Sequence, residues 1–340
     1  LGGGLVAAVG TGAAFALDAA SFVASAVAVF LMRPPAHARS EHAESSVRAV
    51  KEVDDHLQVG GPASAAAKWI DDLLAFCREA GAPIDFVSTH TYGNAPLDLR
   101  PIAARHGFGG LPQWWTEWGA HASHFNPVHD SPWSAAYLVR GMASAMGRTE
   151  AVAYWTVSDH FEELGRPPKL LHGGFGLLSV GNLRKPRWWG LWMLEQLLPE
   201  RLEVEVTCDG AGDMVRAIAS RANDGRVAIL AWNGTVDVTK AAGDALLDRS
   251  VTLEILGLAE QAYRLRHRRL DDDHSNLVRA WRELGGDADW PDDEQWEALR
   301  TANVLEHLEP EREVTPDDDE LTLDVSLPMP SVSLVELVPI

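Results

Sequence analysis

A single carboxylate stands near the end of an apolar stretch in the first half of the chain. Glu117 lies within residues 114–118, which read as a β-strand that ends at Gly119. In barrels of alternating strands and helices, catalytic groups lie at the carboxyl ends of the strands. A carboxylate at this place could act as a nucleophile toward an electrophilic carbon. The alternative is that Glu117 caps the helix that follows the strand.

Two polar side chains, His90 and Tyr92, end the preceding predicted strand, residues 84–92, just before a Gly-Asn turn. Consecutive parallel strands are commonly neighbours in a sheet. A tyrosine hydroxyl or an imidazole N–H at this place could therefore donate to Glu117 and keep it ionised, which suits a nucleophile. The alternative is a structural histidine beside a core tyrosine.

A third group of hydrogen-bonding side chains leaves the predicted strand 151–157. It comprises Trp155, Ser158, Asp159, His160, Glu162 and Glu163. Such a group can bind the hydroxyls of a sugar. Its carboxylates lack the spaced Asp/Asn-Gly loop that calcium sites use, so no metal is predicted. His172 then begins a glycine-rich stretch, residues 172–176, whose backbone could approach either a ligand or an adjacent strand.

The composition narrows the class of ligand. A formal net charge of -20 excludes a nucleic-acid partner, because phosphate binding needs a clustered excess of Lys and Arg. Several of the 13 tryptophans stand beside carboxylates, and flat aromatic faces next to carboxylates suit neutral sugars, although a core role explains many of them. Cys77 and Cys208 are too few for a disulfide framework, so we expect reduced thiols and a cytoplasmic location. No cofactor is predicted.

The elements that must position these groups alternate between strand and helix. Strands are predicted at residues 57–59, 84–92, 114–118 and 151–157, and helices at residues 65–77, 99–106, 131–146 and 188–198. Four strand-then-helix units predict parallel strands with right-handed crossovers. Either half of a (β/α)8 barrel or a small open sheet fits this pattern.

After residue 202 the pattern changes to that of an antiparallel β-sandwich. Strands are predicted at residues 204–208, 214–221, 226–232, 250–255 and 321–338. An acidic helical insertion at about residues 271–308 interrupts them. We therefore expect an α/β domain at residues 50–201 and a sandwich domain at residues 202–340.

The N-terminal residues 1–34 read as a transmembrane-like segment. Asp18 is the only charged residue before Arg33, and residues 11–32 are long enough to cross a bilayer as a helix. Arg33 and Arg39 after it place the following chain, a polar linker at residues 35–49, on the cytoplasmic side. The alternative is a buried Ala-rich helix. Residues 2–10 and 15–22 resemble a helix pair of a major-facilitator transporter, but so short a segment predicts no transport.

A second resemblance covers most of the chain. Its motifs are Gly-Gly-Pro at 60–62, DFVSTHTY at 85–92, Thr-Glu-Trp at 116–118, WTVSDHFEE at 155–163, HGGFGLL at 172–178, Lys-Pro at 185–186, DHSN at 273–276, Ala-Trp at 280–281 and Val-Ser-Leu at 332–334. They resemble, in order, glycoside hydrolase family 39, the β-xylosidase and α-L-iduronidase family.

The resemblance implies a partial (β/α)8 TIM barrel, strands five to eight, followed by the family's C-terminal β-sandwich. It implies hydrolysis of O-glycosidic bonds with retained configuration, and Glu117 as the nucleophile on strand seven. Asp159 becomes structural. By the same resemblance, the residues that contact the sugar are His90, Tyr92, Trp118, Trp155, Glu162, Glu163 and His172.

One part of the family pattern is not found. Retaining glycosidases use two carboxyls about 5–5.5 Å apart, and the family carries its acid/base glutamate in an Asn-Glu-Pro motif on strand four. The sequence contains no such tripeptide, and Glu309-Pro310 follows Leu308 far along the chain. We therefore expect an incomplete β-xylosidase-like enzyme without strands one to four, stable only if another chain completes it as an oligomer. The alternative is a non-catalytic carbohydrate-binding remnant, tethered to a membrane by residues 11–32.

Overall fold

A computed structural model describes residues 46–161, 163–207, 214–286 and 290–340. The predicted membrane segment, the transporter-like stretch, Glu162 and Cys208 lie outside these ranges. Among the helices within them, none is both long and apolar enough to span a bilayer. The described chain divides into two compact units, the smaller made of residues 46–59 and 75–85, and the larger of residues 60–74 and the chain from 86 onward.

The smaller unit contains a helix at residues 46–53 and an anchoring carboxylate. Asp85 accepts a hydrogen bond from the backbone N–H of Val59 at 2.7 Å and lies 2.7 Å from the ammonium of Lys51. The hydrogen bond from Lys51, followed by that from Val59, lowers the pKa of Asp85. This carboxylate therefore ties the helix to the chain that leads into the first strand.

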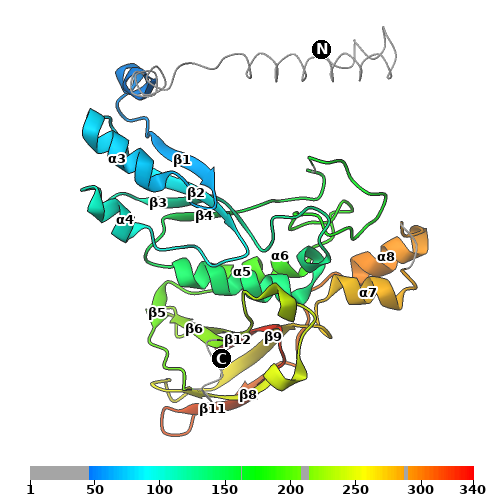
Figure 1. The fold of residues 1–340 in the computed structure, drawn as a ribbon. Coiled ribbons are helices and arrows are strands. Elements are labelled where there is room, and N and C mark those ends of the chain that lie inside the picture. Colours follow the sequence, from blue (N-terminus) through cyan, green and yellow to red (C-terminus); the bar gives the residue numbers. More distant parts are fainter. Residues whose placement is uncertain (1–45, 162, 208–213, 287–289) are drawn as a thin grey trace. The chain divides into compact units, whose positions relative to one another are not determined.

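The larger unit begins with a parallel sheet of four strands in the order β1-β2-β3-β4 (Figure 1). The strands are β1 (Gly60–Ala65), β2 (Phe86–Tyr92), β3 (Gln113–Gly119) and β4 (Ala151–Tyr154). The predicted first strand at 57–59 is wrong. Leu57 is 46% exposed, and pairing with Phe86 begins only at Gly60.

A helix follows each strand of this sheet. The helices are α3 (Ile70–Ala80), α4 (Arg100–Arg105), α5 (Pro132–Ala145) and α6 (Pro186–Glu195). Proline opens both α5 and α6, where its missing N–H leaves no intrahelical bond unmade. The predicted alternation of parallel strands with helices is thus confirmed.

Helix α5 is buried along most of its length, because it packs against three parts of the larger unit. It lies beside α6 and also contacts β7 and β12 of the antiparallel sheet described below (Figure 1). On its other side, Tyr137 stacks on Trp118 of β3 with ring centroids 4.9 Å apart. Gly141 makes this approach possible, since a Cβ there would overlap the Trp118 ring.

The second half of the larger unit is antiparallel, as predicted. One sheet has six strands in the order β10-β9-β12-β7-β6-β5, and the other has two, β11-β8. The strands are β5 (Glu200–Leu202), β6 (Val215–Arg221), β7 (Val227–Asn233), β8 (Arg249–Ile255), β9 (Tyr263–Leu270), β10 (Arg312–Val314), β11 (Leu321–Leu327) and β12 (Ser331–Pro339). Ile255 and Leu323 of the small sheet share one core with Leu265 and Leu337 of the large one, so the two sheets pack face to face.

Three details of this region differ from the sequence-based expectation. The strand predicted at 204–208 is absent from residues 204–207, and the short β5 precedes it instead. Residues 321–338 form two strands, β11 and β12. The strand β9 was not predicted, because its arginines mask the buried positions that alternate with them. Two helices, α7 (Leu277–Glu283) and α8 (Asp293–Ala302), lie between β9 and β10.

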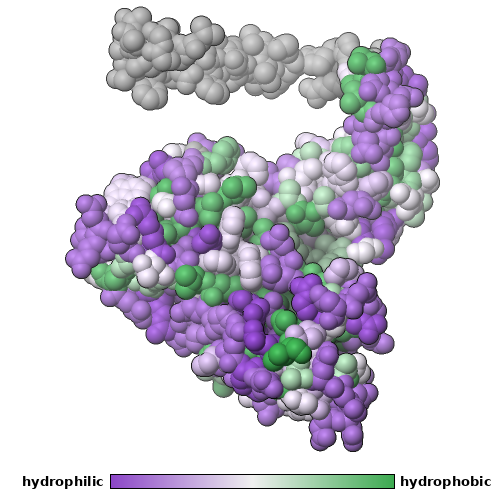
Figure 2. Space-filling view, turned by 180° about the vertical axis from the view of Figure 1, so that it is seen from behind, coloured by the Kyte–Doolittle hydropathy of each residue, from purple (hydrophilic) through white to green (hydrophobic). Residues whose placement is uncertain are grey.

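Hydrophilic residues cover much of the surface around the antiparallel sheets. In the view of Figure 2, they dominate the lower part of the molecule, and hydrophobic residues lie among them in small groups. This distribution agrees with the strongly negative charge of the chain, which places carboxylates on the surface.

Candidate active site

Glu117 lies on β3 directly after a β-bulge. Across the pairing with β2, Thr89 stands opposite Trp115 and His90 stands opposite Glu117, so Thr116 has no partner residue. The pairing with β4 shows the same irregularity. A bulge adds one residue to a strand and changes the face to which the following side chains point. Here it sets the directions of Glu117 and Trp118.

Both oxygens of the Glu117 carboxylate have a partner on β2. The Tyr92 hydroxyl donates to Oε1 at 2.5 Å. The Nδ1 atom of His90 lies 3.4 Å from Oε2, while its Nε2 lies 3.1 Å from the Thr116 hydroxyl. The Glu117 side chain is 23% exposed, so a ligand can reach it, while His90 and Tyr92 restrict its orientation. The structure thus brings together three of the residues named from the sequence.

Tyr92 is a protonated donor over the whole neutral range. Burial raises the pKa of its hydroxyl far above the ordinary value, and the hydrogen bond to Glu117 raises it further. Gly119, the residue paired with Tyr92, provides room for its ring, because a Cβ there would lie 2.8 Å from the Tyr92 Cε1. The absence of a side chain at Gly119 therefore lets the Tyr92 ring lie where its hydroxyl can donate to Glu117.

Trp118 does not belong to the open side of this site, and its predicted contact with sugar is wrong. Its side chain is fully buried at 0% exposure, against Tyr137 and Gly141 of α5. The indole N–H donates to the backbone carbonyl of Asn94 at 2.8 Å. Because side chains alternate along a strand, Trp118 faces the helix while Glu117 faces the other side.

Trp155 and Glu163 follow β4. The backbone N–H of Trp155 donates to the Trp118 carbonyl at 2.8 Å, and its half-buried ring meets that of Phe161 edge to face at 5.1 Å. Glu163 is 60% exposed, and its Oε2 lies 3.8 Å from Nε2 of His124. The Glu163 charge is the smallest of the causes that raise the pKa of Tyr92, after burial and the effects of Glu117 and Tyr154.

His172 is a buried residue, and its predicted contact with a sugar stays a prediction. Its Nδ1 lies 3.1 Å from the carbonyl of Lys169, and its ring packs beside Phe125 at 6.0 Å. The glycine-rich stretch that it begins approaches other protein segments instead of standing free.

A buried ionic cluster that the sequence analysis did not predict fixes this stretch. The Lys185 ammonium lies 2.6 Å from Asp130 and 2.5 Å from Asp159, and all three side chains are buried. Burial would raise the pKa of Asp130, but the charge and hydrogen bond of Lys185 outweigh it and keep that pKa below its usual value. Asp159 is fully buried, and its carboxylate faces the Lys185 ammonium and accepts a hydrogen bond from the Gly176 N–H.

A buried histidine connects the loops that follow β3 and β4. His129 Nδ1 lies 2.9 Å from the Gly173 carbonyl, and Nε2 lies 3.0 Å from the His121 carbonyl. Burial, together with the nearby positive charge of Arg187, lowers the pKa of His129 to about 3. The imidazole is therefore neutral near pH 7 and can donate to only one of the two carbonyls at a time.

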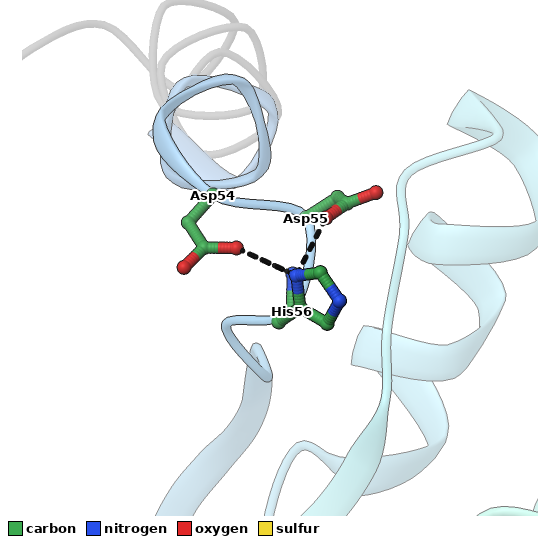
Figure 3. Close-up of side chains that lie close together, drawn as sticks. All are labelled: Asp54, Asp55 and His56. Atoms are coloured by element: carbon green, nitrogen blue, oxygen red, sulfur yellow. Dashed lines mark hydrogen bonds and ion pairs between the residues drawn. The ribbon is translucent and has the colours of Figure 1, made fainter.

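One group of metal-ligating side chains lies elsewhere, in the smaller unit. Figure 3 shows Asp54, Asp55 and His56, with the His56 Nδ1 3.0 Å from an oxygen of each aspartate. All three are exposed neighbours in one turn. Hydrogen bonds from His56 lower the pKa of Asp54. Hydrogen bonding within the turn accounts for this arrangement, and we assign no metal ion to it.

One cleft of the described chain is mainly apolar, and Glu117 is not among its lining residues. It has a volume of about 550 Å³ and is lined by Met142, Met146, Leu191, Leu194, Glu195 and Leu197 of α5, α6 and the residues after them. It contains no group suited to acid, base or nucleophilic chemistry apart from Glu195. The candidate active site is therefore the strand-end group around Glu117.

Comparison with known proteins points in the same direction. The family model "Glycosyl hydrolases family 39" matches residues 41–105 and 98–314. A β-xylosidase from Geobacillus stearothermophilus is 32% identical over 321 residues, which are 86% of this chain and 60% of that protein. A β-xylosidase from Caldicellulosiruptor saccharolyticus is 30% identical over 312 residues, covering 85% of this chain and 61% of that protein. This chain thus spans about 60% of the length of these relatives.

A solved structure shares the fold. The GH39 enzyme from Xanthomonas axonopodis pv. citri superposes with a TM-score of 0.76 at 27% identity, over 90% of this chain and 65% of that one. The parallel sheet and the antiparallel sheets described above therefore occur together in a related protein.

Proposed function

This chain belongs to glycosyl hydrolase family 39, and from that premise we propose that it cleaves O-glycosidic bonds of β-xyloside type with Glu117 as the nucleophile. The observation that supports the role of Glu117 most directly is the 2.5 Å hydrogen bond from Tyr92. The Tyr92 hydroxyl and the adjacent His90 imidazole hold the carboxylate in one orientation. A charged, oriented carboxylate is what a nucleophile requires, whereas a general acid must carry a proton.

The proposed reaction has two displacement steps. In the first, a Glu117 oxygen forms a bond to the anomeric carbon while the bond to the leaving oxygen breaks, and that oxygen takes the electron pair. In the second, a water oxygen forms a bond to the same carbon from the opposite face, the bond to the Glu117 oxygen breaks and returns its electron pair to the carboxylate, and the proton that the water loses passes to the solvent. Two inversions leave the sugar with its original configuration.

The leaving oxygen normally receives a proton from a second carboxyl group. The sequence offers no Asn-Glu-Pro motif for this role, and we assign the role to no residue. Substrates with an activated leaving group do not need this proton, because their oxygen departs as a stable anion. We therefore propose activated aryl xylosides as the substrates on which Glu117 can act by itself.

Covalent labelling tests this proposal. The reagent is an aryl β-xyloside with a dinitrophenyl leaving group and a fluorine in place of the hydroxyl next to the anomeric carbon, which slows the second step. Intact mass spectrometry should show one added fluorosugar, and peptide mapping should place it on Glu117. The matched control is Glu117→Gln, which keeps the size of the side chain. An unlabelled wild-type chain, or equal labelling of Glu117→Gln, would contradict the proposal.

A further inference from the structure

The Lys185 ammonium is an unusual feature for a residue outside the site. It is 0% exposed and lies between the carboxylates of Asp130 and Asp159. Replacing such a buried ionic group by apolar residues of similar volume is often neutral or even stabilising. A contribution to stability is therefore a weak explanation for this cluster, whereas its contacts with the backbone suggest that it fixes the local geometry.

The cluster fixes the backbone of residues 172–176 from both sides. Asp130 accepts a hydrogen bond from the N–H of Gly173, and Asp159 accepts one from the N–H of Gly176, each at 2.7 Å. The Lys185 ammonium donates to the Gly174 carbonyl at 3.1 Å. The guanidinium of Arg187 donates to the carbonyls of Gly174 and Gly176, both at 2.6 Å. Charged groups thus hold the backbone on each side of residue 175.

Phe175 is the side chain that this backbone presents. Its ring is buried, with the Tyr92 ring centroid at 6.1 Å and the His129 ring centroid at 4.9 Å. Its carbonyl accepts a hydrogen bond from Thr156, the residue after Trp155, at 3.1 Å. Phe175 therefore forms a wall beside the tyrosine whose hydroxyl contacts Glu117.

We propose that Lys185 is a positioning residue for the nucleophile, acting through Phe175 and Tyr92. Its ammonium holds residues 172–176 in place, Phe175 then limits rotation of the Tyr92 ring, and the hydroxyl stays aligned with Glu117. This inference rests on the proposed function of Glu117. It concerns a residue that touches neither the substrate nor the nucleophile.

The test compares labelling rates of folded variants at saturating reagent. Lys185→Met keeps the length of the side chain and removes its charge, and we expect about a tenfold lower labelling rate, as for a misaligned reacting group. Lys185→Arg should restore most of the rate. The matched control is Lys169→Met, the same substitution at an exposed lysine, which should label like the wild type.

A second comparison separates positioning from a general effect on folding. In a Tyr92→Phe background, Lys185→Met should cause no further decrease, because the alignment that it serves is already lost. If the two effects multiply instead, Lys185 does not act through Tyr92. Should Lys185→Met fail to fold, Phe175→Ala decides the question, since it leaves the ionic cluster intact. A wild-type labelling rate for Phe175→Ala would overturn the inference.

A third measurement does not depend on glycosidase activity. With fluorotyrosine in place of tyrosine, the fluorine resonance of Tyr92 can be assigned by its loss in Tyr92→Phe. Lys185→Met and Phe175→Ala should both shift this resonance, and Lys169→Met should not. If the wild type is not labelled but the resonance shifts, the proposed function fails while the connection from Lys185 to Tyr92 stands. An unchanged resonance in both variants would overturn that connection.

Discussion

His90 and Glu117 stand opposite each other in neighbouring parallel strands, with the His90 Nδ1 3.4 Å from the Glu117 Oε2. Two residues further along β2, Tyr92 reaches the other oxygen of the same carboxylate. Because His90 and Tyr92 are two residues apart in a strand, their side chains lie on the same face of the sheet. The β2 strand therefore supplies a partner for each oxygen of the Glu117 carboxylate.

Removal of the tyrosine hydroxyl should slow covalent labelling of Glu117. A hydrogen bond to a charged group contributes about 1.5–3 kcal/mol, so we expect Tyr92→Phe to lower the rate by about 10- to 100-fold. The measurement is the rate of fluorosugar incorporation by mass spectrometry. Tyr263→Phe, at a buried tyrosine of β9, is the control and should leave the rate unchanged. An unaltered rate in Tyr92→Phe would mean that this bond does not assist the nucleophile.

A methyl group at residue 119 should displace the Tyr92 ring. Gly119→Ala would place a Cβ 2.8 Å from Tyr92 Cε1, closer than such contacts allow. We expect a labelling rate close to that of Tyr92→Phe, because the same hydrogen bond is lost. Gly110→Ala is the matched control, since a Cβ there meets no atom within 4 Å. If Gly119→Ala labels like Gly110→Ala, the ring tolerates the methyl group and our account of Gly119 is wrong.

The packing of Trp118 on α5 should depend on Gly141. A Cβ at residue 141 would overlap the indole ring, and overpacking of a core costs about 1–3 kcal/mol. We expect Gly141→Ala to lower the free energy of unfolding by that amount in urea denaturation. An equal stability of Gly141→Ala and the wild type would show that β3 and α5 can move apart at little cost.

Stability should fall on mild acidification because of a buried histidine in the sandwich. Burial, and then the charge of Arg269, lower the pKa of His267 from 6.5 to about 4. Between these values the unfolded chain binds a proton that the folded chain does not bind. The free energy of unfolding should therefore decrease as the pH falls from 6.5 to 4, by up to about 3 kcal/mol for this group.

The measurement is urea denaturation at several pH values, and His267→Gln tests the assignment. This variant cannot titrate in the range, so its stability should change less between pH 6.5 and 4 than that of the wild type. Parallel pH profiles of the two proteins would show that another group is responsible. His129, whose pKa is also lowered, should add a similar dependence that remains in the variant.

The approach of His90 and Tyr92 to Glu117 could be anticipated from the sequence, because strand ends of consecutive parallel strands meet at one edge of a sheet. The buried position of Trp118 could not be anticipated in this way. Its burial depends on an extra residue in β3, and a bulge leaves no mark in a run of tryptophans that would suit either face. The ionic cluster was missed for another reason: Asp130, Asp159 and Lys185 are far apart in the chain, and single charged residues carry no periodic signal.

Strand β9 shows the same limit for the fold. Four of its eight residues are arginine, at positions 264, 266, 268 and 269, so hydropathy alone indicates a solvated segment. In the structure it lies between β10 and β12, with Tyr263, Leu265 and Leu270 buried. Arg269 is buried as well, and its guanidinium donates to Ser333 and approaches Asp271. Asp271 is a local partner, but Ser333 and the Ser326 carbonyl, which also accept hydrogen bonds from this guanidinium, belong to distant segments that the local sequence does not show.

Thr116 has no partner residue in the pairing with β2, so the alternation of side chains between the two faces of β3 is interrupted there. A transplant of this strand into another scaffold would need the surplus residue as well as the acid. Without that extra residue, the indole at 118 would turn toward the side that Glu117 now faces and the carboxylate toward the helix, away from His90 and Tyr92.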